Sequence, residues 1–264
     1  MAIAAIIPAR YGASRLPGKP LSDIHGKPMI QHVHERVSRA RGIDRVLVAT
    51  DDERIADAVH RFGGEAVMTS SAHRSGSDRL AEAARMVAAD VIVGVQGDEP
   101  MIDPGAVEAA LRPFAGDASV EAATVCTPLR GVEEMLSPHV VKVVVDARGR
   151  ALYFSRSPIP HVRGGDLREA ARLAVERGLA RRHLGLYAWR REALLRFAAL
   201  PASALEEAEG LEQLRALEHG LGMQVVEFDG DPGVAVDTPE DLERVRALLA
   251  PMGARTNLET GQGR

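Results

Sequence analysis

The strongest constraint on the fold is a regular alternation of apolar and amphipathic stretches over the first 116 residues. Buried strands are indicated by the apolar runs at 3–8, 45–50, 65–69 and 91–96. Amphipathic helices are indicated by apolar side chains at helical spacing over 28–40, 52–62, 77–88 and 104–114. Strands that alternate with helices form a mostly parallel sheet covered by helices on both faces. The sequence therefore predicts an α/β fold.

The regular alternation of predicted strands and helices ends at about residue 116. Further strands are predicted at 120–129, 140–155 with a hairpin turn at 146–149, 183–190, 223–228 and 234–236. Helices are predicted at 204–220 and 237–250, and a loop followed by a helix at 160–180. We expect residues 1–125 and 221–250 to form a nucleotide-binding α/β core and 126–220 a smaller subdomain. Residues 251–264 lack periodicity and are expected to be disordered.

Composition excludes several classes of function. The net charge of −4, the pI near 6.2 and the 3% aromatic content argue against nucleic-acid binding. No apolar run is long enough to span a membrane, and the N-terminus lacks the basic segment of a signal peptide. The single cysteine, Cys126, lies in an apolar run and is interpreted as a small buried hydrophobe. These features predict a cytoplasmic protein.

The loop after the first strand, "ARYGASRLPGKPL" at 9–21, carries Arg10, Arg15 and Lys19. It is not a Walker A loop, because five residues separate its two glycines and Lys19 is followed by Pro20. It also lacks the G-x-G-x-x-G pattern, which disfavours a dinucleotide-dependent oxidoreductase. Its three cations are suited to surround a triphosphate.

Two acidic residues follow other predicted strands. Asp98 lies in "QGDEP" at 96–100, and Asp237 follows the run 234–236. Ligands bind beyond the carboxyl ends of the strands in an open parallel sheet, so we expect both acids to face the basic loop. Carboxylates are suited to Mg²⁺, and cations beside a metal-binding pair are typical of phosphoryl-type transfer. The pattern thus predicts such a transfer with Mg²⁺ as cofactor.

A resemblance to a known family makes this more specific. "PARYGASRLPGKPL", "HRSGSDRLAEA", "VQGDEPMI", "ALYFSRSPIP", "RHLGLYAWR", "LEQLRALEHG" and "GVAVDTPEDLERVR" occur in order, and with other motifs they span about residues 3–248. Together they closely resemble the 3-deoxy-manno-octulosonate (Kdo) cytidylyltransferases. The resemblance implies a Rossmann-like nucleotidyltransferase fold with a smaller subdomain that contains antiparallel strands. It also implies a Mg²⁺-dependent reaction, CTP + Kdo → CMP-Kdo + pyrophosphate, which activates Kdo for lipopolysaccharide synthesis, and a homodimer.

The resemblance also implies roles for individual residues. CTP phosphates are expected to bind to Arg10, Ser14, Arg15 and Lys19, and the cytosine to be framed by Ser75, Gly76 and Arg79. Metal and catalytic roles fall to Asp98, which also contacts the nucleotide, and Asp237, with Arg10, Arg15 and Lys19 as further catalytic groups. The sugar is expected to contact Gln96, Arg156, His183, Tyr187, Glu209 and Gln213.

Spacing adds two expectations to these roles. Glu209 and Gln213 lie four apart on the predicted helix and so share a face. His183 and Tyr187 are an even number of residues apart on a predicted strand and so point to one side. Two other functions stay open: a cytidylyltransferase for another acidic sugar, of the sialic-acid type, and a non-catalytic nucleotide-binding protein.

Overall fold

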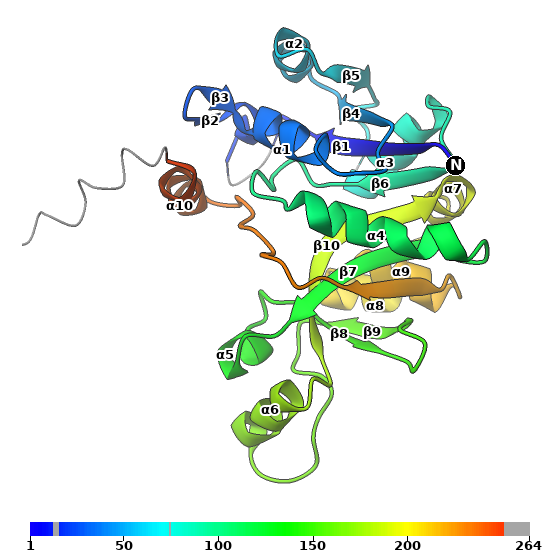
Figure 1. Ribbon diagram of the computed structural model, residues 1–264, viewed down its shortest axis with the longest axis vertical. Coiled ribbons are helices and arrows are strands. Elements are labelled where there is room, and N and C mark those ends of the chain that lie inside the picture. Colours follow the sequence, from blue (N-terminus) through cyan, green and yellow to red (C-terminus); the bar gives the residue numbers. More distant parts are fainter. Residues whose placement is uncertain (13–15, 74, 251–264) are drawn as a thin grey trace, which may run out of the picture.

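The computed structural model describes residues 1–12, 16–73 and 75–250. Its central element is a nine-stranded mixed sheet with strand order β11-β7-β10-β6-β1-β4-β5, and with β8 and β9 attached through β10 (Figure 1). Strands β1, β4, β5 and β6 pair in parallel, and β7 pairs in parallel with β11. Strand β10 runs antiparallel to both β6 and β7. The predicted mostly parallel α/β sheet is confirmed.

The bounds of the elements are as follows. The strands are β1 (Ile3–Ala9), β2 (Asp23–Ile24), β3 (Lys27–Pro28), β4 (Arg45–Thr50), β5 (Glu65–Met68), β6 (Val91–Gly94), β7 (Ala122–Pro128), β8 (Lys142–Val145), β9 (Ala151–Ser155), β10 (Arg181–Arg190) and β11 (Met223–Glu227). The helices are the 3-10 helix η1 (Lys19–Leu21), α1 (Met29–Val37), α2 (Glu53–Arg61), α3 (Gly76–Arg85), α4 (Pro104–Gly116), α5 (Val132–Leu136), α6 (Leu167–Glu176), α7 (Arg191–Ala198), α8 (Ala204–Glu209), α9 (Gln213–Glu218) and α10 (Pro239–Leu249).

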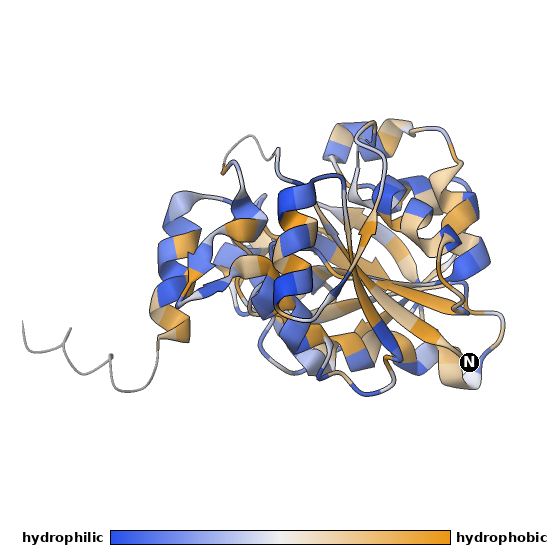
Figure 2. Ribbon diagram, turned by 90° about the horizontal axis from the view of Figure 1, so that it is seen from above, coloured by the Kyte–Doolittle hydropathy of each residue, from blue (hydrophilic) through white to orange (hydrophobic). Residues whose placement is uncertain are grey.

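The core lies on both faces of the sheet. Along β1, Ile3, Ala5 and Ile7 pack with buried residues of α1, α2 and α4, whereas Ala4 and Ile6 pack with those of α3, α7 and α9. This alternation follows from the two-residue period of a strand. The strands of the central sheet are mostly apolar, whereas the helices also carry polar faces (Figure 2). Burial of both sheet faces therefore explains the continuous apolar runs in the sequence.

A smaller unit extends from one end of the sheet. Hairpin β8–β9 turns at Asp146–Gly149, where the Gly149 amide donates to the Asp146 carbonyl at 3.0 Å. Helices α5 and α6 pack together around Met135, Ala170 and Ala174 and lie at the opposite end of the molecule from α2 and β5 (Figure 1). This part of the chain carries one wall of a cavity described below.

Helix starts follow the capping residues in the sequence. Ser75 is the N-cap of α3, and its hydroxyl accepts a hydrogen bond from the Asp78 amide. Thr238 caps α10 in a capping box with Asp241, and Pro239 occupies the first turn. Both caps are hydroxyl side chains, which are among the residue types that favour this position.

Two predicted elements are wrong. The helix expected over 204–220 is two helices, because Gly210 adopts the left-handed conformation (φ 62°) that ends α8. Residues 234–236 form no strand. They are held instead by hydrogen bonds of Val236, whose amide donates to the Asp98 carbonyl at 2.8 Å and whose carbonyl accepts from Lys19 Nζ at 2.9 Å, and by burial of its side chain with Ile24 and Leu242.

Other expectations concern the termini and the membrane. Residues 251–264 lie outside the described residues, so their predicted disorder stays a prediction. In the described part of the chain, every helix is too short or too polar to cross a bilayer.

Cys126 is 3% exposed within β7, as expected for a buried hydrophobe. Burial, assisted by the charge of Glu227, raises the pKa of its thiol to about 12. Because the thiolate is the nucleophile, we expect iodoacetamide at pH 8 to alkylate the native protein far more slowly than the urea-unfolded chain. Mass spectrometry of both states measures this, and equal labelling rates would contradict the burial.

Candidate active site

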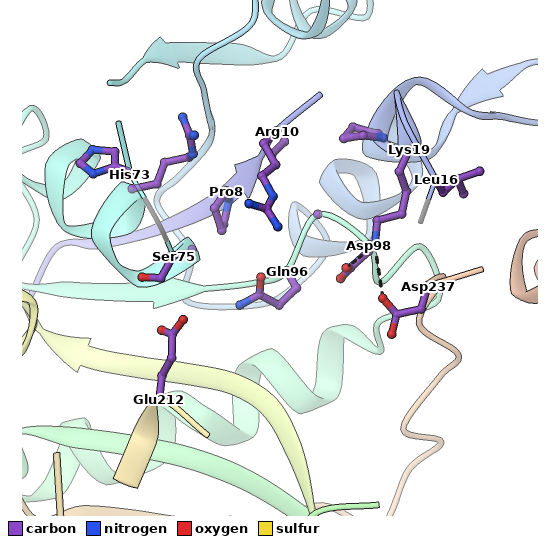
Figure 3. A pocket seen from close by; sticks show the side chains of 15 residues that line it. Pro8, Arg10, Leu16, Lys19, His73, Ser75, Gln96, Asp98, Glu212 and Asp237 are labelled. Carbon is purple, nitrogen blue, oxygen red and sulfur yellow. Dashed lines mark hydrogen bonds and ion pairs between the residues drawn. The ribbon is translucent and has the colours of Figure 1, made fainter. Parts of the chain in front are cut away.

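A cleft of about 300 Å³ opens at the carboxyl ends of β1 and β6 (Figure 3). We call it the main cleft. It is lined by Pro8, Ala9, Arg10, Leu16, Lys19, Pro20, His73, Ser75, Gly76, Arg79, Gln96, Gly97, Asp98, Glu212 and Asp237. Parallel neighbours β1 and β6 end at the same edge of the sheet, which brings the loop after β1 against the turn after β6. Eight predicted site residues therefore meet in one place.

Lys19 connects the two predicted metal-binding acids. Its ammonium donates to Asp98 Oδ2 at 2.7 Å and lies 3.5 Å from Asp237 Oδ1 (Figure 3). It also donates to the Val236 carbonyl at 2.9 Å. Only 13% of the Lys19 side chain is exposed, so the ion pairs are partly shielded from solvent. The two carboxylates, which are 139 positions apart in the sequence, thus approach one cationic group.

Backbone packing fixes this arrangement. Gly97 lies so close to β1 that an added Cβ would stand 2.8 Å from the Pro8 carbonyl oxygen. The Asp98 carbonyl in turn accepts from the Val236 amide, which places Asp237 beside Asp98. The turn after β6 is therefore held against β1 on one side and against the 234–237 segment on the other.

The far end of the main cleft is built by α3. Ser75 and Gly76 line it at the helix start, and the Arg79 guanidinium forms part of its wall. Arg79 is 4% exposed, and it donates to Asp51 Oδ2 at 2.9 Å and to Thr69 Oγ1. The Arg79 side chain is thus fixed by its own protein contacts. Ser14 and Arg15, predicted phosphate contacts, lie outside the described residues.

A second cavity of about 270 Å³ lies beside the turn 97–99. It is lined by Glu99, His139, Val140, Val141, Arg182, His183, Leu184, Gly185, Tyr187, Leu211, Gln213, Pro232, Gly233 and Ala235. Three of the predicted sugar residues, His183, Tyr187 and Gln213, belong to it, and Gln96 lines the main cleft. Burial and the nearby Asp98 raise the pKa of Glu99 to about 8, although Arg182 opposes the shift.

His183 and Tyr187 share a side of β10, and their ring centroids are 5.5 Å apart. Burial lowers the pKa of His183 to about 3, so the imidazole is neutral. Its Nε2 lies 2.9 Å from Thr124 Oγ1, whose hydroxyl donates to the Leu186 carbonyl at 2.8 Å. The hydroxyl oxygen must then accept from Nε2–H, which leaves Nδ1 as an acceptor. Burial also raises the pKa of Tyr187, with Glu212 and Glu99 adding to the effect.

The remaining predicted sugar residues lie elsewhere. Arg156 and Glu209 are bound to each other, since the Arg156 amide donates to Glu209 Oε2 at 2.9 Å and its Nε donates to the Glu209 carbonyl at 2.8 Å. Glu209 does not share a helix with Gln213, because Gly210 separates α8 from α9. The expected common helix face is therefore wrong.

Sequence reasoning missed Glu212, which extends into the main cleft from the side opposite Ser75 (Figure 3). Ser77 Oγ donates to its carboxylate, and burial raises the pKa of Glu212. The predicted single helix over 204–220 places Glu212 inside a helix, whereas the structure places it between α8 and α9. Gly210 was the available signal, because glycine is the usual residue where a helix ends. His73, Glu99, His139 and Arg182 line the cavities without having been singled out.

Comparisons with known proteins show the family of this chain. A family model described as cytidylyltransferase matches residues 4–226. A 3-deoxy-manno-octulosonate cytidylyltransferase of Trichlorobacter lovleyi is 52% identical over 94% of this chain and 99% of the relative. One from Anaeromyxobacter dehalogenans is 53% identical over 94% and 98%. A solved structure of CMP:2-keto-3-deoxy-manno-octonic acid synthetase complexed with CTP superposes with a TM-score of 0.86, at 47% identity over 94% and 98% of the two chains.

Cationic side chains that face paired carboxylates at the edge of a parallel sheet suit the transfer of a nucleotidyl group, and the chain is a nucleotidyltransferase. Its relatives define the group more narrowly. The chain belongs to the cytidylyltransferase family and, within it, to the 3-deoxy-manno-octulosonate cytidylyltransferases. The resemblance seen in the sequence motifs is confirmed.

Proposed function

We propose that this protein transfers the cytidylyl group of CTP to Kdo and releases pyrophosphate. The anomeric hydroxyl of Kdo attacks the α-phosphorus of CTP, the bond to the β-phosphate breaks, and the hydroxyl proton is lost. The reaction supplies CMP-Kdo for lipopolysaccharide synthesis in the cytoplasm. Relatives named for this activity, at about half identity over nearly the whole chain, support the proposal.

The observation that carries the proposal is the position of Lys19 between Asp98 and Asp237 in the main cleft. Arg10 lines the same cleft, so cations are available for the three phosphates. Ser75 and Gly76 then frame the cytosine at the α3 end, and the wall that contains the fixed Arg79 guanidinium limits the size of the base. Charge stabilisation and positioning are the main requirements of such a transfer.

We also propose Mg²⁺ as the cofactor, held by Asp98 and Asp237. The donor set fits, because both carboxylates already lie within reach of one cationic group. Among the described residues, no cluster of three or more His, Cys, Asp or Glu side chains could hold a metal. Two carboxylates are sufficient for Mg²⁺, which usually completes its shell with water and substrate phosphates. When bound, the ion supplies charge neutralisation at the phosphates.

The second cavity is the proposed site for the sugar. It adjoins Asp98 through Glu99 and combines the neutral His183 and Tyr187 rings with the Gln213 amide. Gln213 Nε2 is buried and has no hydrogen-bond partner among the described residues. An unsatisfied donor in a cavity is suited to a polyhydroxylated ligand.

Pyrophosphate release tests the reaction. We expect turnover with CTP, Mg²⁺ and Kdo, and at least about 100-fold lower kcat/KM with a sialic acid, because the second cavity must match the polar groups of its substrate. Removal of Mg²⁺ by a chelator should abolish turnover. Equal rates with both sugars would overturn the sugar assignment, and binding of CTP without turnover would favour a nucleotide-binding protein.

We further propose a homodimer through the antiparallel hairpin β8–β9. Leu152 is 60% and Val145 39% exposed on this one hairpin, so a partner subunit could cover both. We expect Leu152→Glu to shift the protein from dimer to monomer in multi-angle light scattering, because a charge would be buried in an apolar contact. The matched change Leu248→Glu, on the exposed side of α10, should leave the dimer intact.

A further inference from the structure

Three charged side chains outside both cavities hold the walls of the second cavity in place. Lys142, Arg156 and Glu209 are absent from the described residues that line the main cleft and the second cavity. Lys142 and Arg156 donate to carbonyls of residues 137, 138, 140 and 209, which are lining residues or lie within two positions of one. The Glu209 carboxylate in turn binds Ser155 and the Arg156 amide. The three side chains therefore contact the segments that carry the walls of the second cavity, but they do not line that cavity.

Lys142 fixes the wall formed by His139, Val140 and Val141. The side chain is fully buried at the start of β8, and Nζ donates to the carbonyls of Ser137 at 2.8 Å, Val140 at 2.6 Å and Arg156 at 2.5 Å. Burial lowers the pKa of Lys142 to about 8, so at pH 7 the ammonium keeps all three hydrogens for these acceptors. Lys142 therefore donates all three ammonium hydrogens to carbonyls, and these bonds connect the loop after α5 to the end of β9.

Arg156 and Glu209 fix the opposite wall, formed by Leu211 and Gln213. The Arg156 guanidinium donates through Nε to the Glu209 carbonyl at 2.8 Å and through Nη1 to the Pro138 carbonyl at 3.1 Å. The Glu209 carboxylate accepts from Ser155 Oγ at 2.5 Å and from the Arg156 amide at 2.9 Å. Burial alone would raise the pKa of Glu209, but these hydrogen bonds outweigh it and lower the pKa.

The two sets of contacts meet at Arg156. Its carbonyl accepts from Lys142, while its amide and guanidinium bind the end of α8 immediately before the left-handed Gly210. The chain 137–141 is thereby coupled to the chain 209–213 across the second cavity. The contacts that couple the two segments therefore lie outside the side chains that line the cavity.

We infer that Lys142, Arg156 and Glu209 are positioning residues that set the spacing of the two walls of the second cavity for the sugar, and that they do not contact it. The inference rests on the proposed function, in which that cavity holds Kdo. It assigns Arg156 and Glu209 a role different from the direct sugar contact that the sequence resemblance implies.

Steady-state kinetics of Glu209→Gln and Arg156→Lys test the inference. Loss of one hydrogen bond to a charged group should raise the KM for Kdo by about 10-fold or more, while the KM for CTP stays within about twofold. Arg150→Lys is the matched control, because that guanidinium is exposed and paired with Asp146 in the hairpin. Lys142→Met is expected to be more severe, and thermal melting shows whether it folds.

Kdo analogues that each lack one hydroxyl separate positioning from direct contact. A positioning role predicts that Glu209→Gln lowers kcat/KM by the same factor for Kdo and for every analogue. If Glu209→Gln leaves kcat/KM nearly unchanged for one analogue only, Glu209 binds the hydroxyl that this analogue lacks, and the inference is wrong. Unchanged kinetics, or equal rises in both KM values, would also overturn it. Lack of turnover of Kdo by the unaltered protein would instead reject the proposed function.

Discussion

Asp98→Asn is expected to reduce kcat/KM for pyrophosphate release by about 1,000-fold while the protein stays folded. The substitution keeps the shape of the side chain but removes the charge that pairs with Lys19 and that we propose to bind Mg²⁺. Loss of a ligand of the metal ion that neutralises the phosphates should cost several kcal/mol, and each 1.36 kcal/mol is a factor of ten in rate. The coupled assay with CTP and Kdo measures the loss directly.

Stability should change little in this variant. Lys19 keeps its contacts with Asp237 and with the Val236 carbonyl when the Asp98 charge is removed, so its ammonium is not left without a partner. The backbone bond from the Val236 amide to the Asp98 carbonyl is unaffected. Asp57→Asn, on the exposed face of α2, is the control and should have normal activity. Near-normal turnover of Asp98→Asn would remove this carboxylate from the mechanism, and a large fall in Tm would mean that its role is structural.

The features that the sequence predicted well depend on local patterns. Strand and helix periods identify β1, β4 and β6, and the rule that ligands bind beyond parallel strand ends then brings Lys19 and Asp98 together. The caps Ser75 and Thr238 depend on a hydroxyl and an amide only three residues apart. Such features require no knowledge of long-range pairing, which explains why sequence analysis finds them.

The features that it did not predict depend on long-range contacts. Strand β10 inserts antiparallel between β6 and β7, and only this pairing places His183 and Tyr187 beside Glu99. The segment 234–236 has strand-like composition, yet its position depends on hydrogen bonds of Val236 to Asp98 and Lys19 and on burial against α10. Neither partner is near in sequence, so composition alone could not decide between a strand and an irregular segment.

Gly97→Ala is expected to lower kcat/KM by about 100-fold and to destabilise the fold by about 1–3 kcal/mol. The added methyl would stand 2.8 Å from the Pro8 carbonyl oxygen, closer than real Cβ atoms approach such a group. Strand β1 pairs with β4 on one side and β6 on the other, so the strand cannot readily move away. The turn must shift instead, and Asp98 shifts with it relative to Lys19 and Asp237.

Gly94→Ala is the matched control for this effect. Its added methyl would stand 2.7 Å from Leu80 Cδ2, the far end of a flexible side chain that can rotate away. We therefore expect a loss of stability with less than about a 10-fold change in kcat/KM, because Asp98 lies beyond the distorted position. Thermal melting and the pyrophosphate assay on both variants separate the two effects. If the fall in kcat/KM follows the loss of stability equally in both glycine variants, the close approach of the turn to β1 does not position Asp98.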